Sequence, residues 1–133
     1  MKKTHAGFVA TFVLTLATVT AMAHHSFSAE FDADKPFIKK GVVTKIEWMN
    51  PHTYFYIDVT GDDGKVVNWG MEMGSPNGLM RQGWTRNTMK IGDVVTVEGS
   101  LAKDGSNIGN ARAVILASTG KRLFGASSQG QTP

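Results

Sequence analysis

Residues 52–73 read HTYFYIDVTGDDGKVVNWGMEM, two alternating segments on either side of a Gly-Asp-Asp-Gly turn. In the first segment every second side chain is apolar: Phe55, Ile57 and Val59. Such a period of two is typical of a strand with one buried face. Gly and Asp accept the positive φ angles that hairpin turns need. The stretch therefore predicts antiparallel strands over 52–60 and 65–73, joined by a tight hairpin.

The same alternation recurs on both sides of this hairpin. Residues 40–48 are predicted as a strand that ends at Asn50-Pro51, since the residue before proline is biased toward a turn or extended backbone. One face of that strand is expected to carry alternate residues: Val42, Thr44, Ile46 and Trp48. Residues 94–99 and 111–117 are predicted as two later strands, and residues 123–124 as a short last edge.

Between the third and fourth strands the pattern changes to that of a short helix. Ser75 can cap the first turn, and Pro76 suits the first helical position, where its missing N–H would be unpaired anyway. Three strands, a short helix and two strands are the element order of the OB fold. We therefore predict an all-β protein, a small OB-like five-stranded barrel. An open meander or small sandwich with a helix across one end is the alternative.

The first 23 residues have the pattern of a secretory signal peptide. Two lysines precede an apolar run that ends at Ala21-Met22-Ala23, an A-x-A cleavage pattern. Cleavage after Ala23 would leave His24 carrying the free α-amine, whereas cleavage after Ala21 would leave His24 as the third residue. An uncleaved anchor is the alternative, because the run approaches bilayer-spanning length. We expect a periplasmic or secreted protein with no stable membrane anchor after processing.

Length, charge and cysteine content limit the classes of protein. A mature chain of about 110 residues is enough for one domain. We expect an N-terminal arm over 24–39, the barrel over 40–124 and a disordered tail over 125–133. Loss of two lysines with the leader lowers the formal charge from +3 to +1, which argues against nucleic-acid binding. The chain has no cysteine, so disulfides and thiolate metal sites are excluded.

Three histidines of the mature chain are the candidate metal ligands: His24, His25 and His52. An N-terminal His24 offers its α-amine and Nδ1 to one metal ion, and one further imidazole completes a three-nitrogen site suited to Cu(II). This arrangement resembles the histidine brace of copper-dependent polysaccharide oxygenases and some periplasmic copper carriers. His52 is the better third ligand, because neighbouring side chains on an extended backbone point to opposite faces. A solvated, mobile start of the mature chain is the alternative interpretation of His24 and His25.

A second candidate site is a ligand face at and after the first bend, with Trp48, Asn50, Tyr54 and Tyr56. The two tyrosines alternate on the side of His52. In an OB-type barrel this bend and the loop over 103–109 flank the usual ligand face. Strands also favour aromatic residues for purely structural reasons, so the tyrosines are open to either interpretation.

No motif in the sequence indicates catalysis. Glu72 is the carboxylate expected nearest the polar face, but it has no partner acid at a recognisable spacing. Nucleophile-elbow, phosphate-loop and zinc-protease motifs are absent. Met71 and Met73 share a face with Trp69, and methionine is more often a core gap-filler than a Cu(I) ligand. We therefore expect a protein that is not an enzyme.

Several motifs together resemble an uncharacterised family of small secreted bacterial proteins: His24-His25-Ser26-Phe27, Trp48–His52, Gly74-Ser75-Pro76-Asn77, Gly83-Trp84-Thr85, Gly92-Asp93 and Ala102-Lys103-Asp104-Gly105. The resemblance spans nearly all of the mature chain and implies secretion and a single domain, but no activity. It also favours a role for His24, His25 and His52. Two functions follow: a periplasmic Cu(II)-binding protein using His24 with His52, or a non-catalytic OB-like binding module for a small ligand or partner protein.

Overall fold

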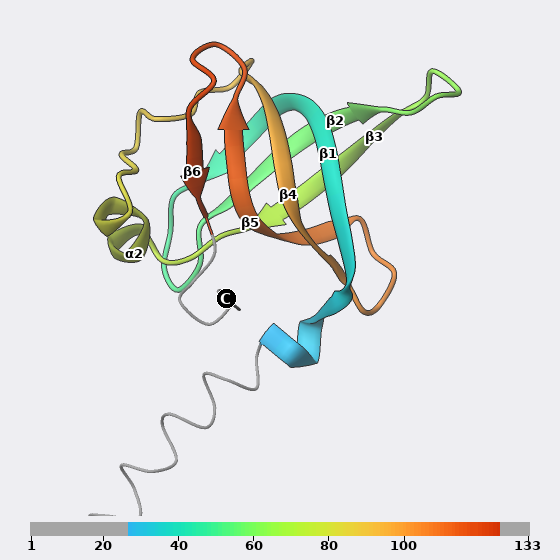
Figure 1. Ribbon diagram of the computed structural model, residues 1–133, viewed down its shortest axis with the longest axis horizontal. Helices are drawn as coiled ribbons and strands as arrows, with labels where there is room; N and C mark the ends of the chain where they lie inside the picture. The colour runs from blue at the N-terminus through green and yellow to red at the C-terminus, as the bar shows by residue number, and fades with distance from the viewer. Residues whose placement is uncertain (1–26, 126–133) are drawn as a thin grey trace, which may run out of the picture.

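The structure, a computed structural model, describes residues 27–125. This part of the chain is mostly β-sheet, which confirms the prediction of an all-β protein (Figure 1). Its elements are β1 (Phe31–Glu47), β2 (Tyr54–Thr60), β3 (Val66–Glu72), α2 (Pro76–Arg81), β4 (Val94–Ala102), β5 (Ile108–Leu116) and β6 (Arg122–Phe124). A helical turn over residues 27–30 precedes β1. None of the helices in this range is long and apolar enough to cross a membrane.

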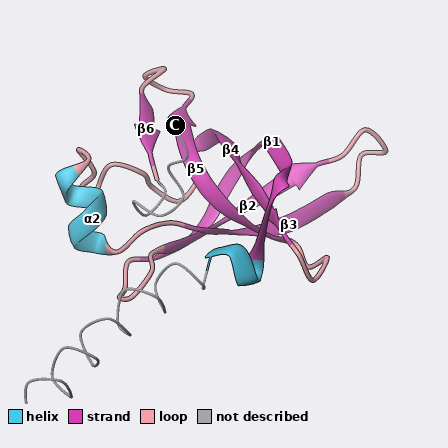
Figure 2. Ribbon diagram, turned by 60° about the horizontal axis from the view of Figure 1, so that its bottom comes forward, coloured by secondary structure: helices cyan, strands magenta, loops and turns pink. Residues whose placement is uncertain are grey.

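The strands form one sheet in the order β3-β2-β1-β4-β5-β6, and neighbours in that order are antiparallel. The sheet curls strongly, so that β3 also meets β5 (Figure 2). This additional pairing is parallel and joins Gly70 to Ile108 and Glu72 to Asn110. The core lies inside the curl, where Phe55, Ile57, Met71, Val95 and Val97 are fully buried.

β1 differs from its predicted extent. It begins at Phe31, and in the stretch 31–39, which we expected in an N-terminal arm, residues 31–32 and 36–39 pair with β4. A register shift lies between Asp32 and Pro36, and the segment around it is polar and exposed. Such a bulge interrupts the alternation on which a strand prediction depends. The polar segment therefore has the sequence pattern of an arm, although it belongs to a strand.

The four residues that were expected to share one face of β1 lie on two faces. Val43 is 1% exposed and belongs to the core, whereas Val42 is 42% exposed and Thr44 is exposed. A second register shift lies between Val43 and Lys45, and it returns Ile46 to the core side together with Trp48. One extra residue in a strand reverses every side chain beyond it. The bulge therefore explains why half of the alternating set faces solvent.

The β2–β3 hairpin agrees closely with its prediction. The strands pair in unbroken register from Tyr54 opposite Glu72 to Thr60 opposite Val66. The turn between them is closed by a hydrogen bond from the Gly61 N–H to the Lys65 carbonyl, 2.8 Å. In Figure 1 the turn end of the hairpin projects away from the rest of the sheet.

α2 and β6 lie on the same side of the fold (Figure 1). The Gly78 N–H donates to the Ser75 hydroxyl, which confirms the predicted cap. The indole N–H of Trp84 donates to the Phe124 carbonyl, 2.8 Å. The second contact connects the segment after α2 to β6.

Gly125 was expected to begin the disordered tail, and this expectation is wrong for that residue. Gly125 is buried, its N–H donates to the Arg112 carbonyl and its own carbonyl accepts from the Gly74 N–H. A Cβ at this position would lie 3.0 Å from the Ala111 carbonyl oxygen, which is a tight contact that glycine avoids. Residues 126–133 of the predicted tail lie outside the described range.

Candidate functional site

A pocket of about 550 Å³ opens at the end of the sheet where β1 begins. Three parts of the chain line it: Ala29–Phe31, then Tyr54 and Glu72 of the hairpin, and finally Ala102–Asp104, Ser106 and Ile108 from the β4–β5 region. The predicted loop over 103–109 therefore contributes to this pocket. The parts are distant in the sequence, and the long-range strand pairings bring them together.

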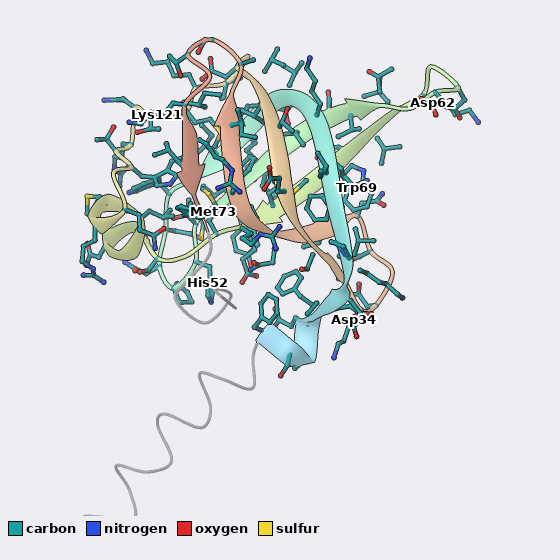
Figure 3. All side chains as sticks on the ribbon, viewed as in Figure 1. Asp34, His52, Asp62, Trp69, Met73 and Lys121 are labelled. Carbon is teal, nitrogen blue, oxygen red and sulfur yellow. The ribbon has the colours of Figure 1, made fainter. Side chains whose placement is uncertain are left out.

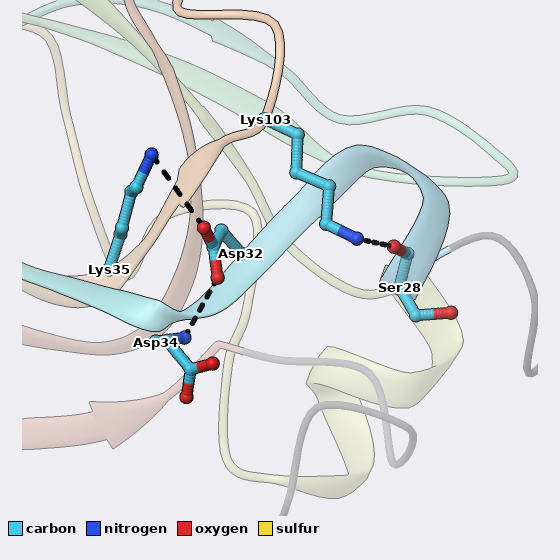
Figure 4. A network of polar contacts seen from close by, with 5 residues as sticks. All are labelled: Ser28, Asp32, Asp34, Lys35 and Lys103. Atoms are coloured by element: carbon cyan, nitrogen blue, oxygen red, sulfur yellow. Dashed lines mark hydrogen bonds and ion pairs between the residues drawn. The ribbon is translucent and has the colours of Figure 1, made fainter.

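The helical turn before β1 is held against the β4–β5 loop. The Lys103 N–H donates to the Glu30 carbonyl, 2.8 Å. The Lys103 ammonium donates to the Ser28 carbonyl, as Figure 4 shows. Nearby, the Asp32 carboxylate accepts from the Asp34 N–H and lies 3.8 Å from the Lys35 ammonium. The two Lys103 contacts hold Ala29 and Glu30 of the turn beside the β4–β5 loop, where both residues line the pocket.

Tyr54 and Glu72 form the polar floor of the pocket. They are directly opposite each other on β2 and β3, where side chains of a cross-strand pair meet. The Tyr54 hydroxyl donates to Glu72 Oε2 over 2.6 Å. Glu72 is only 7% exposed, and this burial raises the pKa of its carboxyl, although the Tyr54 hydrogen bond and His52 act in the opposite direction. Burial and the bond to Glu72 raise the pKa of Tyr54, so Tyr54 stays protonated and remains a donor.

His52 lies just outside the pocket, against the other oxygen of Glu72. Its Nδ1 lies 3.1 Å from the Met73 carbonyl oxygen and 3.5 Å from Glu72 Oε1. Figure 3 shows His52 at the lower edge of the sheet, below Met73. Because a carbonyl oxygen can only accept, Nδ1 carries the proton of this hydrogen bond. In neutral His52 this leaves Nε2 with a lone pair, which is the arrangement of a metal-binding imidazole.

The other two predicted metal ligands, His24 and His25, lie outside the described residues, as do the proposed cleavage sites. Within residues 27–125, no group of three or more His, Cys, Asp or Glu side chains is arranged to hold a metal ion. The structure therefore places one of the three predicted ligands, His52, and gives it a fixed orientation.

The predicted ligand face is divided by the structure. Tyr54 lines the pocket. Tyr56 instead donates to Glu47 Oε2, 3.1 Å, on the open part of the sheet. Trp48 packs partly against the core, and Asn50 is exposed beside a cis peptide bond to Pro51. Of the four residues, only Tyr54 contributes to the pocket.

The sequence interpretation missed the contribution of the turn at residues 27–30. Glu30 and Phe31 line the pocket, yet both were assigned to an arm. One signal for the turn was present, since Phe27 and Phe31 have the i, i+4 spacing of neighbours on a helix. Their ring centroids lie 5.6 Å apart in the structure.

These observations define a small all-β protein with an acidic pocket at one end of its sheet. The chain belongs to a family of unknown function (DUF6152), whose family model matches residues 12–111. The expected membership of an uncharacterised family is thereby confirmed. No curated protein gives a significant match to the chain.

Proposed function

We propose that this chain is a non-catalytic binding module that holds a small ligand in the pocket over Tyr54 and Glu72. The pocket itself carries the proposal. Its volume of about 550 Å³ is that of a small-molecule site. Small-molecule sites commonly combine apolar walls with a few convergent polar groups, and here Phe31 and Ile108 line the same pocket as the Tyr54–Glu72 pair. A buried carboxyl with a raised pKa in a concave site is a further mark of function.

The proposal includes an OB-like barrel as the framework of the module. It is supported by the strand order and by the parallel contact between β3 and β5, which brings distant strands of the curled sheet together. In OB folds the ligand lies over the second and third strands, beside the loop that joins the last two strands of the barrel. The pocket has the same relation to β2, β3 and the β4–β5 loop.

We further propose that the module works in the periplasm or after secretion, because residues 1–23 have the pattern of a cleaved leader. The intact mass of the exported protein tests this part of the proposal. A mass that begins at His24 or Met22 is expected. A mass that retains the first 23 residues would contradict it.

Retention of a ligand by the exported protein tests the binding module. Ala29 is exposed and lines the pocket, so Ala29→Trp should obstruct it without disturbing the core. Ala33→Trp is the matched control, since Ala33 is also exposed but does not line the pocket. Native mass spectrometry after incubation with a periplasmic small-molecule extract should give an adduct of discrete mass with the wild type and Ala33→Trp. The adduct should be absent from Ala29→Trp. Equal retention by all three proteins, or by none, would contradict the proposal.

Cu(II) binding through His24 and His52 is the second candidate function. It is favoured by the orientation of His52, whose Nδ1–H is directed to the Met73 carbonyl and lies near Glu72. Carbonyl and carboxylate partners of this kind orient ligating histidines in metalloproteins. His24 would supply its imidazole and α-amine, with His25 in support.

A competition titration with a chelator tests the copper hypothesis. Replacing either ligand, as in His24→Gln or His52→Gln, should lower the Cu(II) affinity of the processed protein by about tenfold or more. His25→Gln should have a smaller effect. Unchanged affinity in His24→Gln and His52→Gln would exclude this site.

A further inference from the structure

We propose that the ligand of the pocket is an organic ammonium ion, with its cationic group against Glu72 and its carbon skeleton along the apolar walls. This inference rests on the proposed binding module and adds the chemical class of its ligand. It follows from three features of the described residues: the negative charge of the pocket lining, the ability of Glu72 to accept further hydrogen bonds and the apolar character of the walls.

The lining has an excess of negative charge. Glu30, Glu72 and Asp104 contribute carboxylates, against the single ammonium of Lys103. That ammonium already donates to the Ser28 carbonyl, which directs it toward the backbone of the N-terminal turn (Figure 4). Hydrogen bonds to Ser106 lower the pKa of Asp104, so this carboxyl stays ionised at neutral pH. A cation is therefore the charged group that this pocket favours.

Glu72 is the acceptor best placed to bind such a cation. Its Oε2 accepts from Tyr54 over 2.6 Å. Among residues 27–125, the one polar contact of Oε1 is with His52 Nδ1 at 3.5 Å, and the proton of that Nδ1 is directed to the Met73 carbonyl. A carboxylate has room for about four donors, so Oε1 can accept further hydrogen bonds. A buried carboxylate is costly unless it is paired, and a bound ammonium ion would supply the pair.

The walls and the volume favour an organic cation over a metal ion. Phe31, Ile108 and Ala102 provide an apolar surface, and the ring of Tyr54 is of a kind that attracts cations. A pocket of about 550 Å³ is far larger than a single ion requires. No three-ligand metal group occurs in the part of the chain that the structure describes. The cavity thus suits an ammonium group attached to a carbon body.

Three probes that share one ring and differ only in their polar group test the inference: benzylamine, benzyl alcohol and benzoate. Binding to the full processed protein is followed by backbone amide shifts in NMR, which detect weak binding. At neutral pH benzylamine, which is then protonated, should bind about tenfold more tightly than benzyl alcohol, because charge-assisted hydrogen bonds are the stronger ones. Benzoate should bind more weakly still. The amides of residues 103–108 should shift with benzylamine.

The Glu72→Gln variant should remove most of the roughly tenfold preference for benzylamine over benzyl alcohol. Gln keeps an acceptor for Tyr54 and nearly the same volume. Glu30→Gln is the second variant, because Glu30 is exposed and its replacement leaves the core intact; it should reduce the preference by about twofold to threefold. Glu98→Gln is the control, since Glu98 pairs with Arg122 away from the pocket, and it should keep the full preference.

The outcomes distinguish failure of the inference from failure of the binding module. If the three probes bind equally and Ala29→Trp blocks them all, the pocket binds ligands but the ammonium assignment is wrong. Preference for benzylamine that survives in both Glu72→Gln and Glu30→Gln also overturns the assignment. If no probe binds the wild type, the ammonium assignment fails, and the adduct experiment with Ala29→Trp judges the module separately. Displacement of benzylamine by a divalent metal ion alone, at equal concentration, would assign the carboxylates to a metal instead.

Discussion

The two ends of the β2–β3 hairpin are built from the same alternating strands, yet only one end forms a candidate site. At the turn end the strands pair with each other alone, and Val66 and Val67 are 59% and 39% exposed. At the other end β3 also pairs with β5, and Met71 and Glu72 are buried. Polar residues occur at both ends. The comparison teaches that enclosure by distant segments, rather than the local pattern, turns a polar strand residue into a site residue.

Polar cross-strand pairs make this difference concrete. Near the turn, the Asn68 amide donates to Asp58 over 2.8 Å, and both residues remain accessible to water. At the base, Tyr54 donates to a carboxylate that has little access to water. Water competes more strongly for the first hydrogen bond than for the second. Loss of the Tyr54–Glu72 bond should therefore lower the free energy of unfolding more than loss of the Asn68–Asp58 bond.

The largest expected effect is the loss of packing at the enclosed end. Met71→Ala should lower the free energy of unfolding by about 3 kcal/mol, because Met71 is fully buried and its truncation leaves a cavity in the core. Val66→Ala at the turn end should change it by less than about 0.5 kcal/mol, as for other exposed positions. Urea denaturation of both variants measures the contrast. Similar losses would mean that the turn end is as well packed as the base.

An intermediate effect is expected for the two tyrosines, which form a matched pair. Tyr54→Phe removes the hydroxyl that donates to buried Glu72 and should cost about 1–2 kcal/mol. Tyr56→Phe removes the bond to the more accessible Glu47 and should lower the free energy of unfolding by clearly less than Tyr54→Phe does. Unfolding in urea near pH 7 gives both values. A larger loss of unfolding free energy in Tyr56→Phe would contradict the conclusion that the Tyr54–Glu72 end of the hairpin is the enclosed one.

The smallest effect concerns the pH dependence of stability. Burial raises the pKa of Glu72 above its ordinary value of 4.5, so the folded protein holds this proton more tightly than the unfolded chain. The contribution of Glu72 to the free energy of unfolding should therefore be greatest below pH 4.5 and should decline as the pH rises through the folded pKa. The titratable groups facing it are Tyr54, His52 and Glu30.

Glu72→Gln should remove this decline, whereas Glu98→Gln should leave it in place. The wild type and both variants are compared by urea denaturation at several pH values between 4 and 7. The opposite result would be a free energy of unfolding that rises with pH in the wild type and no longer does so in Glu72→Gln. It would mean that the folded protein favours the charged form of Glu72.

The hairpin and α2 were predictable because their signals are local. The alternation of Phe55 and Ile57, the Gly-Asp turn and the Ser75-Pro76 start act over a few neighbouring residues. β1 was predicted less well, since its two bulges depend on how it fits β2 and β4. In the site, Tyr54 and the loop over 103–109 were anticipated, while Glu30 and Phe31 were not.

The sequence by itself determined the all-β class, the position of the hairpin turn and the polar side of β2, because period-two alternation and turn residues impose these locally. Only the tertiary structure decided that Glu72 is buried and that Tyr54, but not Tyr56, faces a pocket. Those outcomes depend on the pairing of β3 with β5 and of Phe31 with Ala102, contacts between segments far apart in the chain. Burial is set by whatever covers a residue, and here the covering segments come from the N-terminal turn and the β4–β5 loop.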